Sequence, residues 1–300
     1  MIEAVSVSKS FDDIKAVDNI SLTLKEGEVF GLIGTNGAGK STFLRMMSGV
    51  IRPDAGSILI DGENVYENPT AKEKFMYLSD EQYFFAGATP EEMAGFYKEL
   101  YTSFDEEKFR KFCETFELGY KRKIRTFSKG MKKQLSVLLG ICAKVKYLFC
   151  DETFDGLDPV MRQAVKSLFA AEMSDRDFTP VIASHNLREL EDICDHVGLL
   201  HKGGVILSKD LADLKSNIHK VQCVFDEKVN IEDVIKNLDV VTSEERGRLH
   251  TFTLRGEVDT ILDAINSFSP VFIEALPLSL EEIFISETGV IGYDIKKLIF

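Results

Sequence analysis

Up to about residue 209, the chain alternates between short apolar runs and longer segments whose hydrophobic positions follow helical spacing. Apolar runs of strand length occur at Glu28–Ile33, Tyr147–Cys150 and Pro180–Ala183, and each is typical of a strand buried on both faces. Further strand-like segments at Lys9–Leu24 and Ser57–Asp61 fit an antiparallel edge sheet. This order of elements predicts an α/β fold with a mostly parallel sheet and crossover helices.

Residues 82–146 interrupt this alternation with a mainly helical pattern rich in Phe, Tyr, Lys and Glu. Thr89 before Pro90 is a helix start signal, and helical spacing of apolar residues predicts another helix at Gly130–Ala143. We therefore expect a separate helical lobe. Two interpretations of Tyr83–Phe85 are open: the rings belong to the core of the lobe, or they are exposed where a partner docks.

The pattern changes again near residue 210. The remaining segments follow the order β-α-β-β-α-β, at residues 221–225, 231–238, 240–243, 249–254, 258–268 and 271–276. This order predicts a small α+β, ferredoxin-like domain at 210–300 after a main domain at 1–209. Residues 210–300 carry nine Lys and Arg against seventeen Asp and Glu, a net charge of −8, which opposes binding to nucleic acid. No motif identifies a ligand, so we interpret this part as an accessory or dimerising domain.

Composition narrows the class of protein. The chain has 300 residues, 44% of them hydrophobic, and a net charge of −13, which suits one large core and a second small domain. We expect no membrane span, because no run of about 18 uninterrupted apolar residues occurs. Ile2–Val7 is too short for a secretion signal and lacks its basic flank. The five cysteines include no Cys-x-x-Cys pair, which favours reduced thiols in the cytosol over structural zinc.

A glycine-rich loop after the first buried strand carries the strongest chemical signal. The sequence GTNGAGKST matches the phosphate-loop pattern Gly-x4-Gly-Lys-Ser, with the nucleotide-binding residues Gly34, Thr35, Asn36, Gly37, Ala38, Gly39, Lys40, Ser41 and Thr42. Glycines let consecutive backbone N–H groups turn toward phosphate oxygens, and the following helix start favours an anion. Lys40 can reach the β- and γ-phosphates, and the Ser41 hydroxyl can ligate Mg²⁺. The loop predicts nucleotide binding.

An acid pair follows the second buried strand. Asp151 stands at the carboxyl end of this strand, where it can hold Mg²⁺. Glu152 is one residue further on and points away from Asp151, so it can polarise a water for attack on the γ-phosphate. An ordinary surface acid pair at a strand end is the alternative.

At this point the chain resembles the nucleotide-binding subunit of an ABC transporter, over about residues 1–209. TFSKGMKKQL at Thr126–Leu135 resembles the family's signature sequence in the variant common among ABC-2-type exporters. DGLDP at Asp155–Pro159 looks like the D-loop, and LEEIF at Leu280–Phe284 is similar to the closing segment of many ABC-2-type subunits. The resemblance implies an ABC-type P-loop ATPase fold with a helical lobe, and ATP and Mg²⁺ as cofactors.

The resemblance also implies roles for two rings. Phe11 sits where the family has an aromatic that stacks on adenine, and plain core packing is its alternative. His185 follows the strand Pro180–Ala183 and looks like the switch histidine that contacts the γ-phosphate. A satisfied structural histidine is the alternative for His185. Glu152 and His185 are thus the expected catalytic residues.

The signature and the D-loop would act on the nucleotide of a second subunit. The residues expected to act in trans are Ser128, Lys129, Gly130 and Asp158. Ser128 also has a local explanation, because it can cap the helix at Gly130–Ala143. Lys129 replaces the first glycine of the usual signature pair, and it is either a partner for an incoming phosphate or a solvated surface charge.

The chain departs from the family between the two loops. The family usually has a Gln there that contacts Mg²⁺ and senses the transporter, whereas FMYLSDEQ puts Asp80 in this place and Gln82 two residues on. Asp80 can still ligate a hard cation through oxygen, so we assign it, with Ser41 and Asp151, to the metal site. Because the Asp80 side chain is shorter and charged, we expect the geometry that couples ATP hydrolysis to the transporter to differ from that of the family.

Taken as a whole, the resemblance implies an ATPase subunit at the cytoplasmic face of the membrane that dimerises on ATP and drives a separate permease. The dimer could be a homodimer or a heterodimer, and no nucleic-acid partner is expected. Export of a peptide or drug is the preferred cargo class. The alternative is a soluble ABC-type ATPase that acts on ribosomes or DNA, but such proteins usually carry two ATPase units, coiled-coil insertions or zinc insertions.

Overall fold

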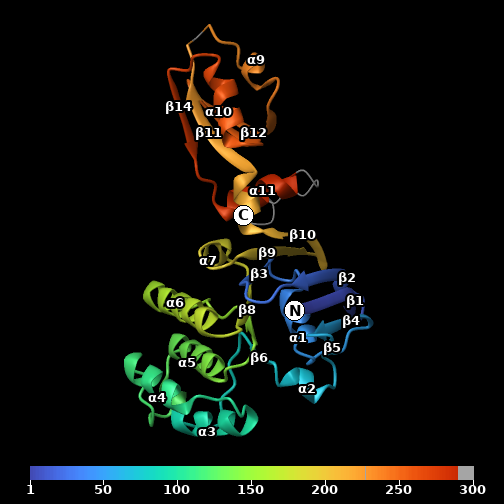
Figure 1. The fold of residues 1–300 in the computed structure, drawn as a ribbon, viewed down its shortest axis with the longest axis vertical. Coiled ribbons are helices and arrows are strands. Elements are labelled where there is room, and N and C mark those ends of the chain that lie inside the picture. The colour runs from blue at the N-terminus through green and yellow to red at the C-terminus, as the bar shows by residue number, and fades with distance from the viewer. Residues whose placement is uncertain (227, 290–300) are drawn as a thin grey trace. The chain divides into compact units, whose positions relative to one another are not determined.

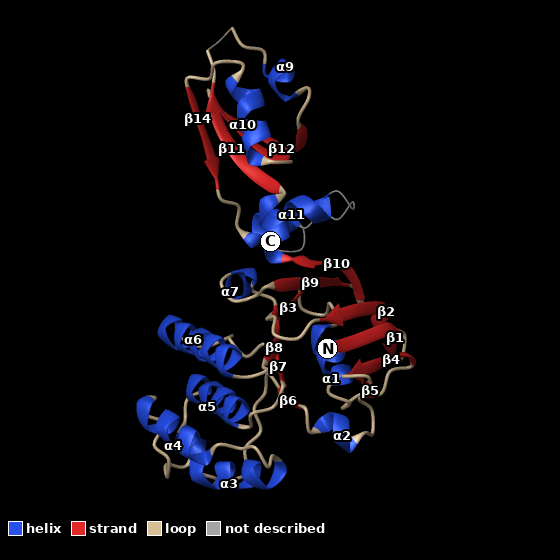
Figure 2. Cartoon of the chain, viewed as in Figure 1, coloured by secondary structure: helices blue, strands red, loops and turns tan. Residues whose placement is uncertain are grey.

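The computed structural model describes residues 1–226 and 228–289. The chain divides into two compact units, Met1–Ser208 and Lys209–Phe300 (Figures 1 and 2). Each unit has its own sheets and helices, and each is described by itself below.

The centre of the first unit is a mainly parallel six-stranded sheet. Its strands, in spatial order, are β10 (Gly204–Asp210), β9 (His196–His201), β3 (Phe30–Ile33), β8 (Thr179–Ser184), β7 (Tyr147–Asp151) and β6 (Phe75–Leu78). Strands β9, β3, β8, β7 and β6 pair in parallel. Every residue of β3, β7 and β8 is buried, because layers of structure cover both faces of the sheet. The three predicted buried strands are thus confirmed.

An antiparallel sheet packs on this core. Its strands, in spatial order, are β2 (Ile14–Leu24), β1 (Ile2–Phe11), β4 (Ala55–Ile60) and β5 (Glu63–Asn64). The predicted strand-like segment Lys9–Leu24 is in fact the end of β1 and all of β2, joined by a turn in which Asp12 has a φ of +50°. Apolar residues of this sheet and of the parallel sheet form one core with Phe43 and Leu44.

Eight helical segments belong to the described part of the first unit. They are α1 (Lys40–Met47), α2 (Pro69–Lys72), α3 (Pro90–Leu100), α4 (Glu106–Thr115), a 3-10 helix (Ile124–Thr126), α5 (Lys129–Cys142), α6 (Pro159–Asp175) and α7 (Leu187–Glu191). Helices α3, α4 and α5 pack on one another as a helical lobe (Figure 1). Thr89 and Glu92 form a capping box before Pro90, so the predicted helix start is confirmed.

At the start of the lobe, Tyr83 and Phe85 are exposed and Phe84 is half-buried, so the core interpretation is wrong for Tyr83 and Phe85. Tyr83 is 77% and Phe85 is 41% exposed. The Phe85 ring meets the ring of Phe96 edge to face, with 4.8 Å between centroids. These rings therefore form an aromatic surface on the lobe.

The second unit contains one antiparallel sheet with helices. Its elements in chain order are α8 (Leu211–Ser216), β11 (Ile218–Val224), α9 (Ile231–Ile235), β12 (Asp239–Arg246), β13 (Leu249–Arg255), α10 (Val258–Asn266), β14 (Phe272–Leu276) and α11 (Leu280–Gly289). The strand order in the sheet is β12-β13-β11-β14, and every pairing is antiparallel. From β11 to β14 the element order is the predicted β-α-β-β-α-β, and the ferredoxin-like assignment stays a prediction.

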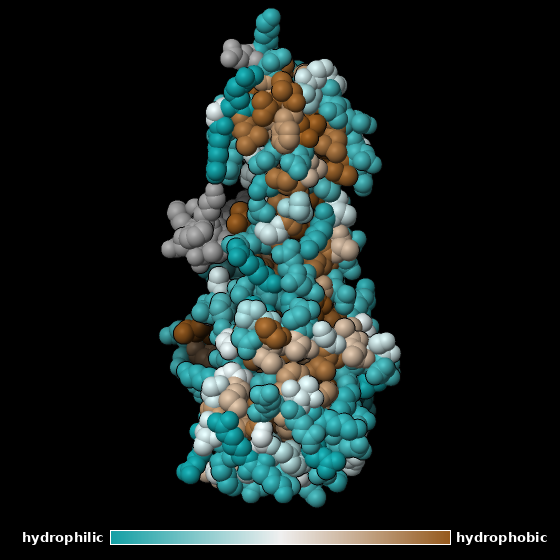
Figure 3. Space-filling view, turned by 90° about the vertical axis from the view of Figure 1, so that its left-hand side faces the viewer, coloured by the Kyte–Doolittle hydropathy of each residue, from teal (hydrophilic) through white to brown (hydrophobic). Residues whose placement is uncertain are grey.

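The second unit has a separate hydrophobic core, in which Phe252 and Leu254 of β13 pack with Ile261 and Ile265 of α10. On the face shown in Figure 3, its surface mixes hydrophilic and hydrophobic residues. In residues 1–226 and 228–289, no helix combines the length and the hydropathy that crossing a membrane would require.

Candidate functional site

The phosphate loop connects β3 to α1, and close contacts require glycine at two of its positions, Gly34 and Gly39. Gly39 has a φ of +102°, and a Cβ there would lie 2.2 Å from the Ala16 carbonyl oxygen. A Cβ at Gly34 would lie 2.6 Å from the Leu200 carbonyl oxygen. Gly39 is also the N-cap of α1 and supplies no side-chain cap, so the first N–H groups of this helix have no capping side chain. Such a helix start suits an anion.

The side chain of Lys40 lies inside this loop. It is only 4% exposed, and its Nζ donates to the Gly34 carbonyl at 2.7 Å and to the Thr35 carbonyl at 3.3 Å. Its third contact is with Glu152, whose Oε1 lies 3.3 Å away. The loop, the lysine and the acid pair are therefore brought together as predicted.

Asp151 ends β7 and is held by two hydroxyl groups. Ser41 donates to its Oδ1 and Tyr77 of β6 donates to its Oδ2, each at 2.9 Å. Burial raises the pKa of Asp151, and the two hydrogen bonds oppose this effect only in part. Burial also raises the pKa of Tyr77 to about 12, so its hydroxyl is a stable donor. A hydrogen bond to Tyr77 in turn raises the pKa of the Arg45 guanidinium.

Glu152 lies between Lys40 and His185. Its Oε2 is 2.9 Å from Nδ1 of His185, and its Oε1 contacts Lys40. The backbone of Glu152 has a φ of +48°, a left-handed conformation that is uncommon outside glycine. This conformation turns the side chain away from Asp151 and toward the loop. The His185 ring is 44% exposed and reaches Glu152, so it contributes to the cluster rather than to the core.

The donor set around Ser41 fits a magnesium ion. Mg²⁺ prefers oxygen ligands, and proteins usually hold it with one or two carboxylates together with substrate phosphates. The Ser41 hydroxyl and the buried Asp151 carboxylate, which is 1% exposed, supply such oxygens next to the phosphate loop. In the described residues, no group of three or more His, Cys, Asp or Glu side chains forms a site that could hold a metal by itself. The set thus suits a metal that arrives with a nucleotide.

The signature and D-loop residues belong to two helix starts. Ser128 caps α5 by accepting a hydrogen bond from the Met131 N–H at 3.2 Å, and Asp158 caps α6 by accepting one from the Met161 N–H at 2.9 Å. Ser128, Lys129 and Asp158 are exposed. The predicted capping by Ser128 is confirmed, and the trans role of these residues stays a prediction.

Phe11 ends β1 and is exposed rather than buried in the core. Its ring is 45% exposed, and the ammonium of Lys9 lies 5.6 Å from the ring centroid. The core-packing alternative for Phe11 is therefore wrong, because the ring faces solvent beside the turn between β1 and β2. An exposed ring can receive a base by stacking.

Asp80 contacts the helical lobe. Its Oδ1 accepts a hydrogen bond from Nζ of Lys133 in α5 at 3.0 Å, while Asp151 takes its hydrogen bonds from Ser41 and Tyr77. Ligation of a metal by Asp80 stays a prediction.

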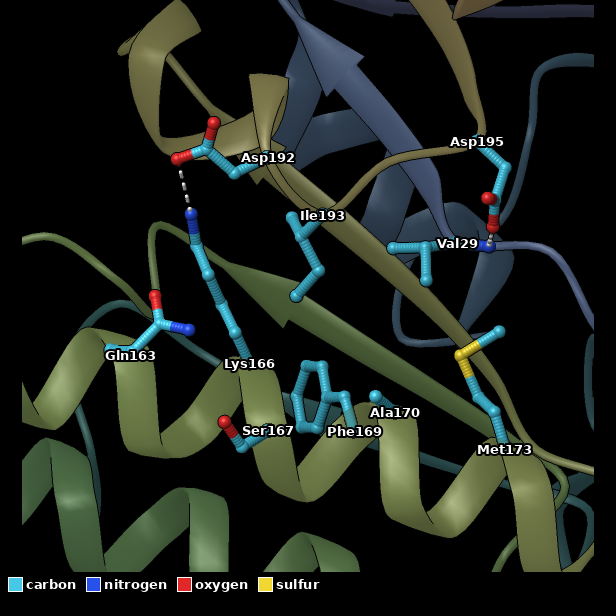
Figure 4. Close-up of a pocket in the computed structure, with 10 residues that line it drawn as sticks. All are labelled: Val29, Gln163, Lys166, Ser167, Phe169, Ala170, Met173, Asp192, Ile193 and Asp195. Atoms are coloured by element: carbon cyan, nitrogen blue, oxygen red, sulfur yellow. Dashed lines mark hydrogen bonds and ion pairs between the residues drawn. The ribbon is translucent and has the colours of Figure 1, made fainter.

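A pocket lies between α6 and the segment that leads from α7 into β9. This pocket of ≈ 540 Å³ is shown in Figure 4. Its charged residues have partners within it, because Lys166 donates to Asp192 at 3.2 Å and Asp195 accepts from the Val29 N–H at 2.8 Å. None of its lining residues belongs to the motif cluster.

Comparison with known proteins identifies the family. The model of the "ABC transporter" family matches residues 17–155. The chain is 32% identical over 289 residues to the ABC transporter ATP-binding protein YtrB of Bacillus subtilis, which covers 96% of this chain and 98% of the relative. The chain belongs to the ABC transporter ATP-binding proteins. Subunits of this family hydrolyse ATP, so this ABC protein is an ATPase.

Two further similarities agree with this ABC assignment. The bacitracin transport ATP-binding protein BcrA of Bacillus licheniformis is 29% identical over 223 residues, which cover 73% of each chain. A solved structure described as an ATP binding subunit of an ABC transporter superposes with a TM-score of 0.66 at 24% identity, over 72% of this chain and 92% of the other. The second similarity shows the ABC ATPase fold, so the predicted α/β fold class is confirmed.

Two residues of the ABC site, Tyr77 and Lys133, could not be recognised from the sequence motifs. Tyr77 sits in the short apolar run Phe75–Leu78, where a single hydroxyl gave no signal beside its apolar neighbours. Lys133 is buried in α5, where most of the other buried residues are apolar. A lysine on the buried side of an amphipathic helix usually needs a partner, and this signal could have found it.

Proposed function

We propose that this chain is the ATP-hydrolysing subunit of an exporter, in which it dimerises on ATP and drives a separate membrane permease. The observation that carries the proposal is the meeting of the phosphate loop with both acids: Ser41 contacts Asp151, and Lys40 contacts Glu152. Positioning and neutralisation of charge are the main requirements of phosphoryl transfer, and this cluster supplies both.

Each residue of the cluster takes a distinct role in the proposal. Lys40 neutralises phosphate charge, and the loop N–H groups at Gly34–Thr42 orient the phosphates. Ser41 and Asp151 would hold Mg²⁺, which when bound neutralises the charge that develops on the phosphate oxygens. Glu152 polarises a water that attacks the γ-phosphorus, and the bond to the leaving ADP oxygen breaks.

His185 completes the cluster. Its hydrogen bond with Glu152 at 2.9 Å fixes the carboxylate on the side of the loop. In the proposal the exposed part of the same ring contacts the γ-phosphate, and Phe11 stacks on the adenine.

The active site is proposed to be split between two subunits. Ser128 is the exposed N-cap of α5 and Gly130, which is half-buried, lies in its first turn, where the first N–H groups of a helix attract an anion. In the proposed dimer they close over the γ-phosphate held by the loop of the other copy, with Lys129 beside it and Asp158 at the seam. A single copy would then be an incomplete enzyme.

Two observations support a membrane partner: the family to which the chain belongs and the exposed aromatic surface of the helical lobe. ATP-binding subunits of ABC transporters act with a membrane permease, and the exposed rings of Tyr83 and Phe85 supply an apolar surface on which such a partner could pack. The name of BcrA refers to bacitracin transport. We therefore favour export of a peptide or drug, with this chain attached to the cytoplasmic face of the permease.

Co-expression tests the transport assignment. The full chain is produced together with a candidate permease from the same genome, and the complex is isolated in detergent. The proposal predicts that the pair copurifies and that the permease raises the rate of ATP hydrolysis. Copurification with ribosomes in place of a membrane protein would contradict it.

A further inference from the structure

The loop that follows β6 is joined to the helical lobe by an ion pair. Asp80 in this loop accepts a hydrogen bond from Nζ of Lys133 at 3.0 Å. The loop is closed on itself, because Gln82 Nε2 donates to the Asp80 carbonyl at 2.6 Å and to the Ser79 carbonyl at 3.3 Å. The backbone of Asp80 is therefore tied to the rest of the loop.

Lys133 has a second contact, and this one reaches the candidate active site. Its Nζ donates to the backbone carbonyl of Glu152 at 2.7 Å. The Lys133 side chain is only 10% exposed, whereas Asp80 is 57% exposed. A buried ammonium is costly unless it is paired and hydrogen-bonded, so Lys133 depends on these two oxygens.

The carbonyl that Lys133 holds belongs to a residue with an uncommon backbone. Glu152 has a φ of +48°, and its carbonyl also accepts the Asp155 N–H at 3.3 Å. A non-glycine residue keeps this conformation only where its surroundings enforce it. The Lys133 hydrogen bond is one such restraint, and the same conformation sets the carboxylate of Glu152 between Lys40 and His185.

We propose that Asp80 and Lys133 are positioning residues that hold Glu152 in its productive conformation and transmit the position of the loop and lobe to it. The inference rests on the proposed role of Glu152. It gives Asp80 a function through Lys133 rather than through a metal. A displacement of the loop at residues 79–82 separates Asp80 from Lys133, loosens the Glu152 backbone and lowers the rate of hydrolysis while leaving nucleotide binding in place.

The test is a double-mutant cycle on ATP hydrolysis by the full chain. Lys133→Met keeps the apolar stem but removes the charge, and we expect kcat to fall by at least about tenfold, because small misplacements of a reacting group cost rate. Asp80→Asn should lower kcat less. Since both act through one contact, the double variant should be no slower than Lys133→Met alone.

KM for ATP should stay within about twofold, since binding does not use this contact. Lys133→Arg should retain most of the rate.

The exposed pair Lys111–Glu107 supplies matched controls, because it is an ion pair of the same lobe with side chains 68% and 69% exposed. Lys111→Met and Glu107→Gln should each change kcat by less than about twofold, as expected of surface pairs. A measurement independent of turnover is amide hydrogen exchange over residues 152–158. Lys133→Met should speed exchange at the Asp155 N–H by at least about tenfold and leave α6 unchanged.

Each of three outcomes would overturn the inference. The first is that the losses of kcat in the two single variants add up in the double variant, and the second is unchanged exchange at Asp155 in Lys133→Met. The third is a higher Mg²⁺ requirement in Asp80→Asn but not in Lys133→Met, which would mark Asp80 as a metal ligand. The proposed function is tested separately by Glu152→Gln. If Glu152→Gln loses turnover while Lys133→Met keeps it, only the positioning role fails.

Discussion

Ser41 and Asp151 are 110 positions apart in the sequence, yet the Ser41 hydroxyl donates to Oδ1 of Asp151 at 2.9 Å. This contact joins the start of α1 to the end of β7. It exists because parallel strands deliver their carboxyl ends to the same edge of a sheet, where α/β proteins bind ligands. The hydroxyl and the carboxylate thus form the two protein sides of the proposed magnesium site.

Tyr77→Phe tests how this carboxylate is positioned. The change removes the second hydroxyl that Asp151 accepts from, at 2.9 Å, and leaves the ring in place. We expect the Mg²⁺ concentration for half-maximal activity to rise by about tenfold, the usual scale for lost support of a metal ligand. Tyr101→Phe, which loses only a 3.4 Å hydrogen bond to the Phe75 carbonyl, is the control. Equal Mg²⁺ requirements in the two variants would contradict this role of Tyr77.

Gly39→Ala tests the requirement for glycine in the phosphate loop. The new Cβ would lie 2.2 Å from a backbone oxygen at a φ of +102°, so the loop must shift. We expect loss of most ATP affinity and about 3 kcal/mol of stability. Gly37→Ala is the matched variant, because Gly37 also has a positive φ, +81°, but no atom within 4 Å of the added Cβ. It should lose only about 1–2 kcal/mol, and thermal unfolding distinguishes the two.

Much of this site could be predicted from the sequence, because its chemistry depends on short local patterns. The loop at Gly34–Thr42 and the acid pair Asp151–Glu152 each carry their signal within a few residues. The contacts of Asp80 could not be predicted, since its partner Lys133 is 53 positions away and only the packing of the lobe brings them together. The exposure of Phe11 could not be predicted either, because a ring at the end of a strand can face the solvent or the core.

The secondary structure was also predicted only in part. The long helical spacing at Gly130–Ala143 correctly predicted α5, whereas the turn at Asp12 inside the predicted strand-like segment Lys9–Leu24 was missed. The apolar pattern continues through this hairpin from β1 into β2, and no glycine or proline marks the turn.

Glu172→Gln tests stability through pH. Burial raises the pKa of Glu172, but hydrogen bonds from Lys108 and Arg176 outweigh burial and hold the pKa below its usual value of 4.5. A lowered pKa means that the ionised carboxylate contributes stability above the unfolded pKa and loses it as pH falls through the folded pKa. At pH 7 the variant should lose about 3 kcal/mol in the free energy of unfolding.

The difference between the wild type and Glu172→Gln should begin to shrink as pH falls below about 4.5, where the carboxyl of Glu172 takes up a proton in the unfolded chain, and it should vanish as pH falls through the lower pKa of the folded protein. Urea unfolding at several pH values measures it. A constant difference across this range would show that the charge of Glu172 is not what stabilises the link between α4 and α6.

Ser128→Arg tests the split site. An arginine at the start of α5 should block closure on the nucleotide of the other copy, so ATP-dependent dimerisation should disappear while binding of a fluorescent ATP analogue persists. Loss of the cap should cost about 1 kcal/mol, and thermal unfolding checks that the variant is folded. Thr115→Arg, at the exposed end of α4, is the control. Dimerisation of Ser128→Arg with ATP, measured by sedimentation, would rule out the two-subunit arrangement.

The most direct test of the account is ATP hydrolysis by Glu152→Gln. The substitution keeps the shape of the side chain but removes the charge that faces Lys40 and His185. The account predicts that kcat falls by at least about 100-fold while ATP binding persists and an ATP-bound dimer accumulates. Hydrolysis at the wild-type rate by Glu152→Gln would contradict the proposed role of Glu152.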